Sequence, residues 1–408
     1  MNQVRPRSSV ISSTEAMLPK GGGPLVLQAM PALAAPADRV ALDLAEALRV
    51  AGGASLVASS GGALVPELAR SGARHVALPL DRRNPFAIRA NAGRLARLIG
   101  EQDVEILHAR GRSAAWPAYL AARRTGRYFV ATVDRIHRRG GALGHFYSSV
   151  VARADRVIAV SNFVADHLRE RYGVDDRRLR LVRRGIDLVR FDPARVSAER
   201  VIMQAQQWRL PDGVPIVMMP APFVRGGGQS ALITALARVQ ARDFHALLLA
   251  LGEGEEGQDR TIEEEIGRLG LAGRVQVVRE CRDMPAAYML ADVVVQAASE
   301  PEAFLSVIAE AQAMGRPAVA FATGGAVEQL AGGVMAWLVE PGRSESLANA
   351  VAAALTLTLE ERQALAPEAI RRVRRSHAKD QMCMRTLEVY RELLEAPRWR
   401  AAPALTVA

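Results

Sequence analysis

The stretch from Pro24 to Ala58, PLVLQAMPALAAPADRVALDLAEALRVAGGASLVA, decides the fold class of this 408-residue chain. Leu25 to Ala29 is a short apolar run of the length of a strand, and Asp38 to Val50 is a longer amphipathic segment with helical spacing. A second apolar run follows from Ser55 to Ala58. A strand, a helix and a strand in this order predict a βαβ unit, whose strands lie parallel in one sheet.

The same alternation continues to about Arg190, pauses, and restarts after Pro215. Before the pause we expect further strands at His75–Leu78, Val104–Leu107, Tyr128–Thr132 and Val157–Val160. After it we expect strands at Ile216–Met219, Ala246–Leu251, Val275–Val278, Val293–Gln296, Ala318–Phe321 and Ala336–Val339, with final helices at Leu359–Ser376 and Gln381–Glu395. This pattern predicts an α/β fold of two doubly wound Rossmann-like domains facing across a cleft, with the ligand at the carboxyl ends of the strands.

The chain length also indicates more than one domain, because 408 residues exceed one ordinary hydrophobic core. We expect an amino-terminal domain at 24–205, a carboxyl-terminal domain at 206–378, and a last helix at 379–398 that packs back on the first domain. Residues 1–23 and 399–408 are expected to be tails. The first tail lacks the apolar centre of a secretory signal, and no run reaches the roughly 20 apolar residues that span a bilayer, so we expect a cytoplasmic protein.

The formal net charge of +10 comes almost wholly from arginine, since Lys20 and Lys379 are the only lysines. The arginines are scattered over many segments, which argues against nucleic acid as a partner. A basic surface also suits peripheral contact with the inner face of a membrane, if the substrate is lipid-linked. Cys281 and Cys383 are the only cysteines, and no His, Asp and Glu cluster has metal-ligand spacing, so we expect neither a disulfide framework nor a bound metal.

Glu302 and Glu310 lie eight positions apart in SEPEAFLSVIAEAQAMGRP, which runs from Ser299 to Pro317. Helical spacing places Glu310 at the border of an apolar stripe rather than opposite to it. A partly buried carboxylate is costly unless it is hydrogen-bonded, and a polyhydroxylated ligand would supply such bonds. The alternative is a surface helix whose glutamate simply borders the core.

This stretch, together with Gly315-Arg316-Pro317 and Gly324-Gly325-Ala326, resembles the donor site of retaining glycosyltransferases of family 4, which have the GT-B fold. The resemblance extends from about Pro24 to Leu394 and includes three more segments, Ile106–Gly111, Ala154–Ser161 and Arg184–Asp187 with Phe191-Asp192-Pro193. It implies that the first domain holds the acceptor and the second a nucleotide-sugar. It further implies that Glu310 binds ribose hydroxyls, that Glu302 binds the transferred sugar, and that the amides of Leu305 and Ser306 meet the diphosphate without an obligatory metal.

The phosphate clamp of that family departs from its usual pattern here. The family has an arginine after the first strand of the second domain and a lysine five positions later, and these positions hold Pro222 and Gly227. Arg225 remains nearby, and Gly226, Gly227 and Gly228 could form a backbone nest for phosphate. The alternative is a flexible loop whose glycines only permit a turn.

The first domain departs too. In the loop from Leu33 to Asp38, the family's two glycines are replaced by Ala35 and Pro36. Asp134 stands where the resemblance places a histidine near the reacting sugar, so Asp134 and Glu302 are the candidate catalytic residues. His137 could take the place of that histidine; the alternative is that it faces solvent on its loop. Leu305 itself replaces a glycine that usually follows the phenylalanine.

Two functions follow from this mixture of retained and lost residues. The first is transfer of a hexose, with retention, from a nucleotide-diphosphate sugar to a glycan or lipid-linked acceptor, as in polysaccharide or lipopolysaccharide biosynthesis. The alternative is a catalytically impaired GT-B relative that binds a sugar-nucleotide, a glycan or a partner enzyme. A dinucleotide-binding oxidoreductase is disfavoured, because no Gly-x-Gly-x-x-Gly follows the first expected strand.

Overall fold

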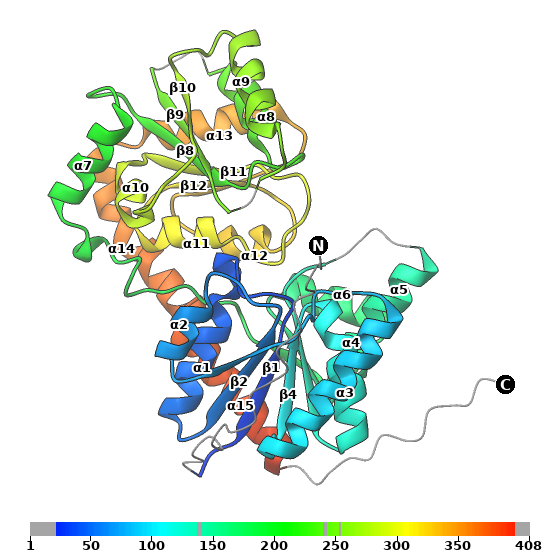
Figure 1. Cartoon of the computed structure of the whole chain (residues 1–408). Coiled ribbons are helices and arrows are strands. Elements are labelled where there is room, and N and C mark those ends of the chain that lie inside the picture. The colour runs from blue at the N-terminus through cyan, green and yellow to red at the C-terminus, as the bar shows by residue number, and fades with distance from the viewer. Residues whose placement is uncertain (1–21, 137–140, 240–242, 253, 396–408) are drawn as a thin grey trace, which may run out of the picture.

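The structure is a computed structural model that describes residues 22–136, 141–239, 243–252 and 254–395. Both expected tails therefore lie outside the described residues, apart from residues 22 and 23, and so does His137. Figure 1 shows two lobes, each built around one sheet with helices on both of its faces. This arrangement confirms the predicted pair of doubly wound domains.

The first lobe holds a seven-stranded sheet in the order β3-β2-β1-β4-β5-β6-β7, and all of its paired strands are parallel. Its strands are β1 Leu25–Ala29, β2 Ala54–Ser59, β3 Arg74–Ala77, β4 Ile106–Arg110, β5 Tyr128–Val133, β6 Arg156–Ala159 and β7 Leu179–Leu181. The order reverses direction next to β1, so the loops that follow β1 and β4 diverge there. Such a point is where doubly wound sheets place their ligands.

The second lobe holds a six-stranded parallel sheet in the order β10-β9-β8-β11-β12-β13. Its strands are β8 Ile216–Ala221, β9 His245–Ala250, β10 Val275–Val278, β11 Val293–Gln296, β12 Ala318–Phe321 and β13 Ala336–Val339. The strand order changes direction between β8 and β11. The loops that follow these two strands are therefore where a doubly wound sheet is expected to bind its ligand.

The helices cover both sheets. In the first lobe they are α1 Val40–Val50, α2 Val65–Arg70, α3 Pro85–Gln102, α4 Arg112–Thr125, α5 Ala142–Ser148 and α6 Asn162–Tyr172. The next are α7 Ala198–Trp208, α8 Gln229–Leu236, α9 Gln258–Arg268, α10 Met284–Leu290, α11 Ser306–Ala313, α12 Ala326–Leu330, α13 Ser344–Thr356, α14 Leu359–Ser376 and α15 Lys379–Glu395. Short 3₁₀ turns lie at Pro36–Arg39, Ser149–Arg153 and Pro193–Arg195. Among the described helices, none combines the length and apolar character needed to cross a bilayer.

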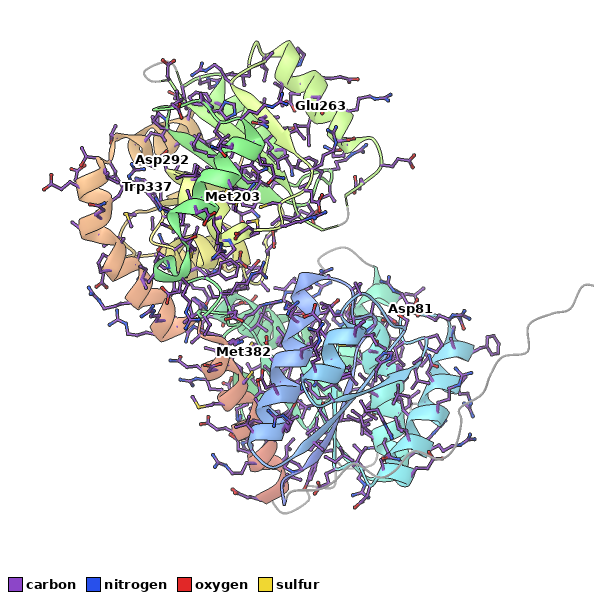
Figure 2. All side chains as sticks on the ribbon, turned by 60° about the vertical axis from the view of Figure 1, so that its left-hand side comes forward. Asp81, Met203, Glu263, Asp292, Trp337 and Met382 are labelled. Carbon is purple, nitrogen blue, oxygen red and sulfur yellow. The ribbon has the colours of Figure 1, made fainter. Side chains whose placement is uncertain are left out.

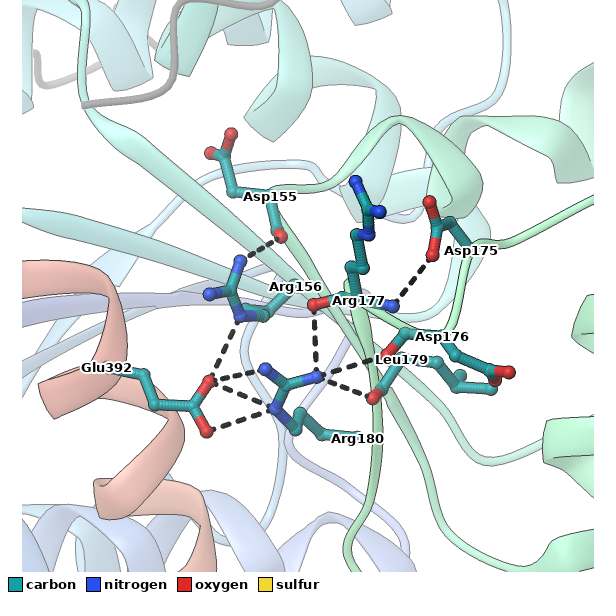
Figure 3. A network of polar contacts seen from close by, with 8 residues as sticks. All are labelled: Asp155, Arg156, Asp175, Asp176, Arg177, Leu179, Arg180 and Glu392. Atoms are coloured by element: carbon teal, nitrogen blue, oxygen red, sulfur yellow. Dashed lines mark hydrogen bonds and ion pairs between the residues drawn. The ribbon is translucent and has the colours of Figure 1, made fainter. Parts of the chain in front are cut away.

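The last helix, α15, packs on the sheet of the first lobe. Its Tyr390 is fully buried in a cluster with Val26, Ile106 and Val130, from the central strands. Glu392 of the same helix forms ion pairs with Arg156 and Arg180, at 3.1 and 2.8 Å (Figure 3). Apolar burial and a partly exposed ion-pair network together hold α15 on the first lobe.

The two chain crossings between the lobes lie side by side. Ile186, which follows β7, donates its N–H to the His377 carbonyl at 2.8 Å and accepts from the Lys379 N–H at 3.1 Å. A Cβ atom at Gly185 would lie only 2.5 Å from the Cα of Lys379, so this contact requires glycine. Figure 2 marks Met382 where α15 leaves the crossing, and its Sδ lies 3.4 Å from the Gly185 nitrogen.

A second polar contact joins the lobes at the start of α6. The Glu328 carboxylate of α12 accepts from the amide of Asn162, the side chain of Asn162 and the amide of Phe163, at 3.1, 3.0 and 3.2 Å. A carboxylate suits the unpaired N–H groups and positive dipole end of a helix amino terminus. The contact therefore connects the two lobes on one side of the cleft.

Candidate functional site

Three loops pack together at the carboxyl edge of the second sheet, because they follow the neighbouring strands β8, β11 and β12. A Cβ atom at Gly228, in the first loop, would lie 2.3 Å from the carbonyl carbon of Ala297 in the second. The third loop meets the second where Gly325 donates its N–H to the Glu302 carbonyl at 2.8 Å. Glycine lets these backbones approach closely. The result is one continuous surface that carries the sequence-predicted donor residues.

Glu302 lies on the second of these loops, and its side chain is exposed at the rim of a shallow hollow. Leu305, Gln296, Phe321 and Thr323 line the same hollow. Although Glu302 is exposed at the rim, the surrounding loops partly desolvate its carboxyl and raise its pKa, and the positive charge of Arg135 opposes this shift. Arg135 belongs to the first lobe, just after β5, so the charge of the first lobe reaches the candidate sugar-binding carboxylate.

Glu310 lies inside α11 and is half-buried. The hydroxyl of Tyr288, a fully buried residue of α10, donates to Glu310 Oε2 at 2.8 Å. Burial raises the pKa of Glu310 to about 7, although the Tyr288 hydrogen bond and the charges of Arg190 and Arg184 lower it. The helix spacing that placed this residue at the border of the apolar stripe agrees with its half-buried position.

The raised pKa of Glu310 makes the stability of the fold depend on pH. An ordinary glutamate titrates near 4.5, so the protonated carboxyl is favoured in the folded state, and its contribution is complete below pH 4.5. That contribution is lost as pH rises through about 7, and it amounts to roughly 3 kcal/mol at 1.36 kcal/mol for each pH unit. We expect wild-type protein to lose stability relative to Glu310→Gln between pH 4.5 and 7.5 in urea unfolding. Parallel curves for the two proteins would show that Glu310 titrates normally.

The amino terminus of α11 lies directly after the glutamate loop. Ser306 is its exposed first residue, and the first-turn amides of a helix have no partner within the helix. The Leu305 amide, however, donates to the Gln329 side chain at 2.8 Å, and the Leu305 carbonyl accepts from the same side chain at 3.1 Å. Because Gln329 occupies the Leu305 amide, Ser306 is the better placed of the two for an anion.

The glycine loop after β8 is closed by its own hydrogen bonds. The Arg225 amide donates to Glu255 at 3.1 Å, and the Gly227 amide donates to the Val224 carbonyl at 2.9 Å. Gly226 and Gly228 have positive φ values of 79° and 97°. The side chains of Arg225 and Pro222 are exposed. Two of the four amides at positions 225–228 are thus engaged within the protein, which limits the backbone nest to Gly226 and Gly228.

Asp134 follows β5 in the first lobe and is half-buried. Its negative charge acts on the guanidinium of Arg184, and the charge of Arg184 acts on Glu310. Arg184 also donates from Nη2 to the carbonyl of Ala37 at 2.8 Å, in the loop where the resembled family has two glycines. The fold therefore brings both Asp134 and Glu310 close enough to Arg184 for its charge to act on them.

The sequence did not identify Arg110, Arg135 and Arg184 as candidate site residues. Arg184 stands in a segment, Arg184–Asp187, that was used only for the resemblance, and Arg110 lies within another such segment, Ile106–Gly111. The charges of Arg110 and Arg135 both act on Arg184. An unusual arginine inside a segment that otherwise fits a family could have drawn attention to them.

His108 is a satisfied core residue. Its ring nitrogens lie 2.5 Å from the Tyr390 hydroxyl and 2.7 Å from the Thr132 hydroxyl, and its side chain is fully buried. Burial keeps the pKa of His108 well below its ordinary value, so the ring is neutral. It holds α15 to β4 and β5 and does not reach the candidate site.

Comparison with known proteins gives consistent matches. Residues 37–190 match the model for Glycosyltransferase Family 4, and residues 203–372 match that for Glycosyl transferases group 1. A D-inositol 3-phosphate glycosyltransferase of Salinispora tropica is 32% identical over 206 residues, which are 48% of this chain and 42% of that protein. The chain thus spans about half the length of the curated relatives that it matches most strongly.

Two further similarities cover more of each partner. A GDP-mannose-dependent alpha-(1-6)-phosphatidylinositol monomannoside mannosyltransferase of Mycolicibacterium smegmatis is 28% identical over 69% of this chain and 75% of that protein. The crystal structure of a glycosyltransferase from Rickettsia africae ESF-5 has a TM-score of 0.85 and 29% identity, over 92% of this chain and 100% of that one. Residues 37–190 and 203–372 are therefore similar to two glycosyltransferase families, and the two lobes have the GT-B architecture of solved glycosyltransferases.

Proposed function

We propose that the protein is a glycosyltransferase that moves a hexose from a nucleotide-diphosphate sugar to a glycan or lipid-linked acceptor, with retention of configuration. The observation that carries this proposal is the position of Glu302 and Glu310. Both lie at the carboxyl edge of the second sheet, and charges of Arg135 and Arg184 act on them. Carboxylates accept hydrogen bonds from sugar hydroxyls, and nearby cations suit a diphosphate.

In the proposed arrangement, the second lobe binds the donor and the first lobe binds the acceptor. Glu310 accepts from the ribose and Glu302 from the transferred hexose, while Ser306, Gly226 and Gly228 offer amides to the diphosphate. Asp134 lies near the reacting sugar on the first lobe. Because the two relatives described above are named for phosphorylated inositol substrates, acceptors of that kind are the first to test.

Titration with a panel of nucleotide-sugars, followed by transfer assays, tests this function. We expect binding of at least one donor and a product whose anomeric configuration, read by NMR, equals that of the donor. Activity unchanged by EDTA would support the further part of the proposal that no metal is required. Failure to bind any nucleotide-sugar would contradict the whole proposal.

The second candidate function is that of an impaired relative that binds a sugar-nucleotide, a glycan or a partner enzyme without transfer. The observation that favours it is the pair of clamp positions, which hold Pro222 and Gly227. Donor binding without transfer or hydrolysis, for every acceptor tried, would support this second function over the first.

Peripheral membrane contact is also part of the proposal. Phe86, Leu143 and Phe146 are 87%, 86% and 56% exposed, and the exposed Arg82 and Arg83 precede the first of them. The charge of Arg83 acts on Tyr147, so the α3 start and α5 lie near one another. Apolar side chains beside arginines suit an anionic membrane surface. Co-flotation with anionic vesicles, compared with neutral ones, tests this contact.

A further inference from the structure

Three arginines near the cleft have no carboxylate partner among the described residues. Arg110 ends β4, Arg135 follows β5, and Arg184 lies in the crossing after β7. None of them forms an ion pair within 4.0 Å with a described residue, whereas Arg156, Arg180, Arg200 and many others do. Among the described residues, the three therefore have carboxylates near them but no carboxylate in direct contact.

Their surroundings make this arrangement costly without a ligand. Arg184 is half-buried, and burial lowers the pKa of its guanidinium; the charges of Arg110 and Arg135 add to this effect, while those of Asp134 and Asp38 oppose it. The Nε atom of Arg110 is buried without a hydrogen-bond acceptor. Like charges that are gathered and partly desolvated favour the binding of an anion.

The position of these arginines matches the donor's diphosphate. Charges of Arg184 and Arg135 act on Glu310 and Glu302, which hold the two ends of the donor in the proposed function. At the same time, the usual lysine position has no room for a side chain. A Cβ atom at Gly227 would lie 2.7 Å from Gln229 Oε1 and 2.9 Å from the Pro222 carbonyl oxygen. Position 227 therefore cannot supply the usual cation, and the exposed Arg225 is the only arginine or lysine at positions 222–228.

We propose that Arg184, assisted by Arg110 and Arg135, forms a phosphate site in the cleft that holds the leaving diphosphate of the donor. This role rests on the proposed function. During transfer, the bond between the anomeric carbon and the diphosphate oxygen breaks, and its electron pair stays on the diphosphate. The acceptor oxygen bonds to the anomeric carbon, and its proton passes to the diphosphate. Arg184 stabilises the charge that develops on the leaving group.

Titration of the full chain with UDP, GDP and D-inositol 3-phosphate, together with transfer kinetics, tests the assignment. We expect Arg184→Gln to weaken binding of the nucleoside diphosphate by about 10- to 100-fold. It should lower kcat by about 100-fold. Arg184→Lys should retain part of both, and Arg97→Gln, an exposed arginine on α3, should change neither.

Each outcome separates the possibilities. If Arg184→Gln weakens binding of the inositol phosphate but not of the nucleoside diphosphate, the site serves the acceptor's phosphate and the assignment to the leaving group is wrong. If an active wild type and Arg184→Gln have equal kcat, the assignment fails while the proposed function stands. If the wild type binds no nucleotide-sugar, the proposed function fails as well. Should Arg184→Gln unfold, as its melting curve would show, Arg110→Gln and Arg135→Gln carry the same test.

Discussion

Replacing Glu302 by glutamine should lower the rate of sugar transfer by about 10- to 100-fold, because hydrogen bonds to a charged acceptor contribute roughly 1.5–3 kcal/mol. The fold should survive this change. The hydrogen bonds that hold the loop use its backbone and the Gln329 side chain, including the Gly325 N–H that donates to the Glu302 carbonyl at 2.8 Å. Steady-state kinetics with the donor identified by titration, alongside a melting curve, measures both effects.

Glu345→Gln provides the matched control, since Glu345 is an exposed glutamate in the first turn of α13. It should transfer sugar at the wild-type rate. If Glu302→Gln does the same, Glu302 does not contact the sugar, and the proposed donor site loses the residue nearest to the reaction.

Much of the fold follows from buried apolar runs. Val275–Val278, Val293–Gln296, Ala318–Phe321 and Ala336–Val339 are strands with the predicted bounds, and Leu359–Ser376 is a helix with the predicted bounds. The shift of β4 from Val104–Leu107 to Ile106–Arg110 reflects its polar end, since His108 and Arg110 did not fit an apolar run. Polar residues at the end of a strand, such as His108 and Arg110 in β4, thus make its bounds hard to predict from apolar runs.

Three helices, α10, α13 and α3, are hard to predict from apolar periodicity, for reasons that differ from those at the strand ends. α10, Met284–Leu290, is only two turns long and begins at an Asp283 cap, whose side chain accepts from the Ala286 amide at 3.1 Å. α13, Ser344–Thr356, buries Leu347, Val351 and Leu355 in the core of the second lobe, but alanines lie on both its buried and its exposed face and weaken the contrast. α3 begins at Pro85 because the Asn84 side chain caps it by accepting from the Ala87 amide, and proline suits the first position of a helix. Tertiary packing, more than periodicity, stabilises such elements.

Some residues of the candidate site could be predicted from the sequence, and others could not. Glu302 and Glu310 could be found by their spacing, because one loop and its following helix hold both. That Tyr288, Arg135 and Arg184 act on these glutamates could not be predicted, since the three come from other elements and approach only when the chain folds. The parallel strands gather the loops at one edge of each sheet, which a pattern along the chain does not reveal.

Replacing Gly228 by alanine should destabilise the protein by more than about 3 kcal/mol, in the range of the severe point mutations. Its φ is +97°, which strains any residue with a Cβ atom, and that atom would lie 2.3 Å from the Ala297 carbonyl carbon and 2.6 Å from the Ala297 oxygen. Both neighbours are backbone atoms at the end of β11, which cannot rotate away. Urea unfolding gives the free energy, and donor titration should show loss of binding with it.

Gly226→Ala is the control that separates steric contact from backbone strain. Gly226 also has a positive φ, +79°, but a Cβ atom there would meet only the Ser299 Oγ, at 3.8 Å. The cost should then be near 1 kcal/mol, the usual price of a left-handed residue other than glycine. Equal unfolding free energies for the two variants would mean that this loop does not pack on β11 as the structure has it. A large difference would show that Gly228 packs closely on the end of β11 and so fixes the glycine loop against the loop that carries Glu302.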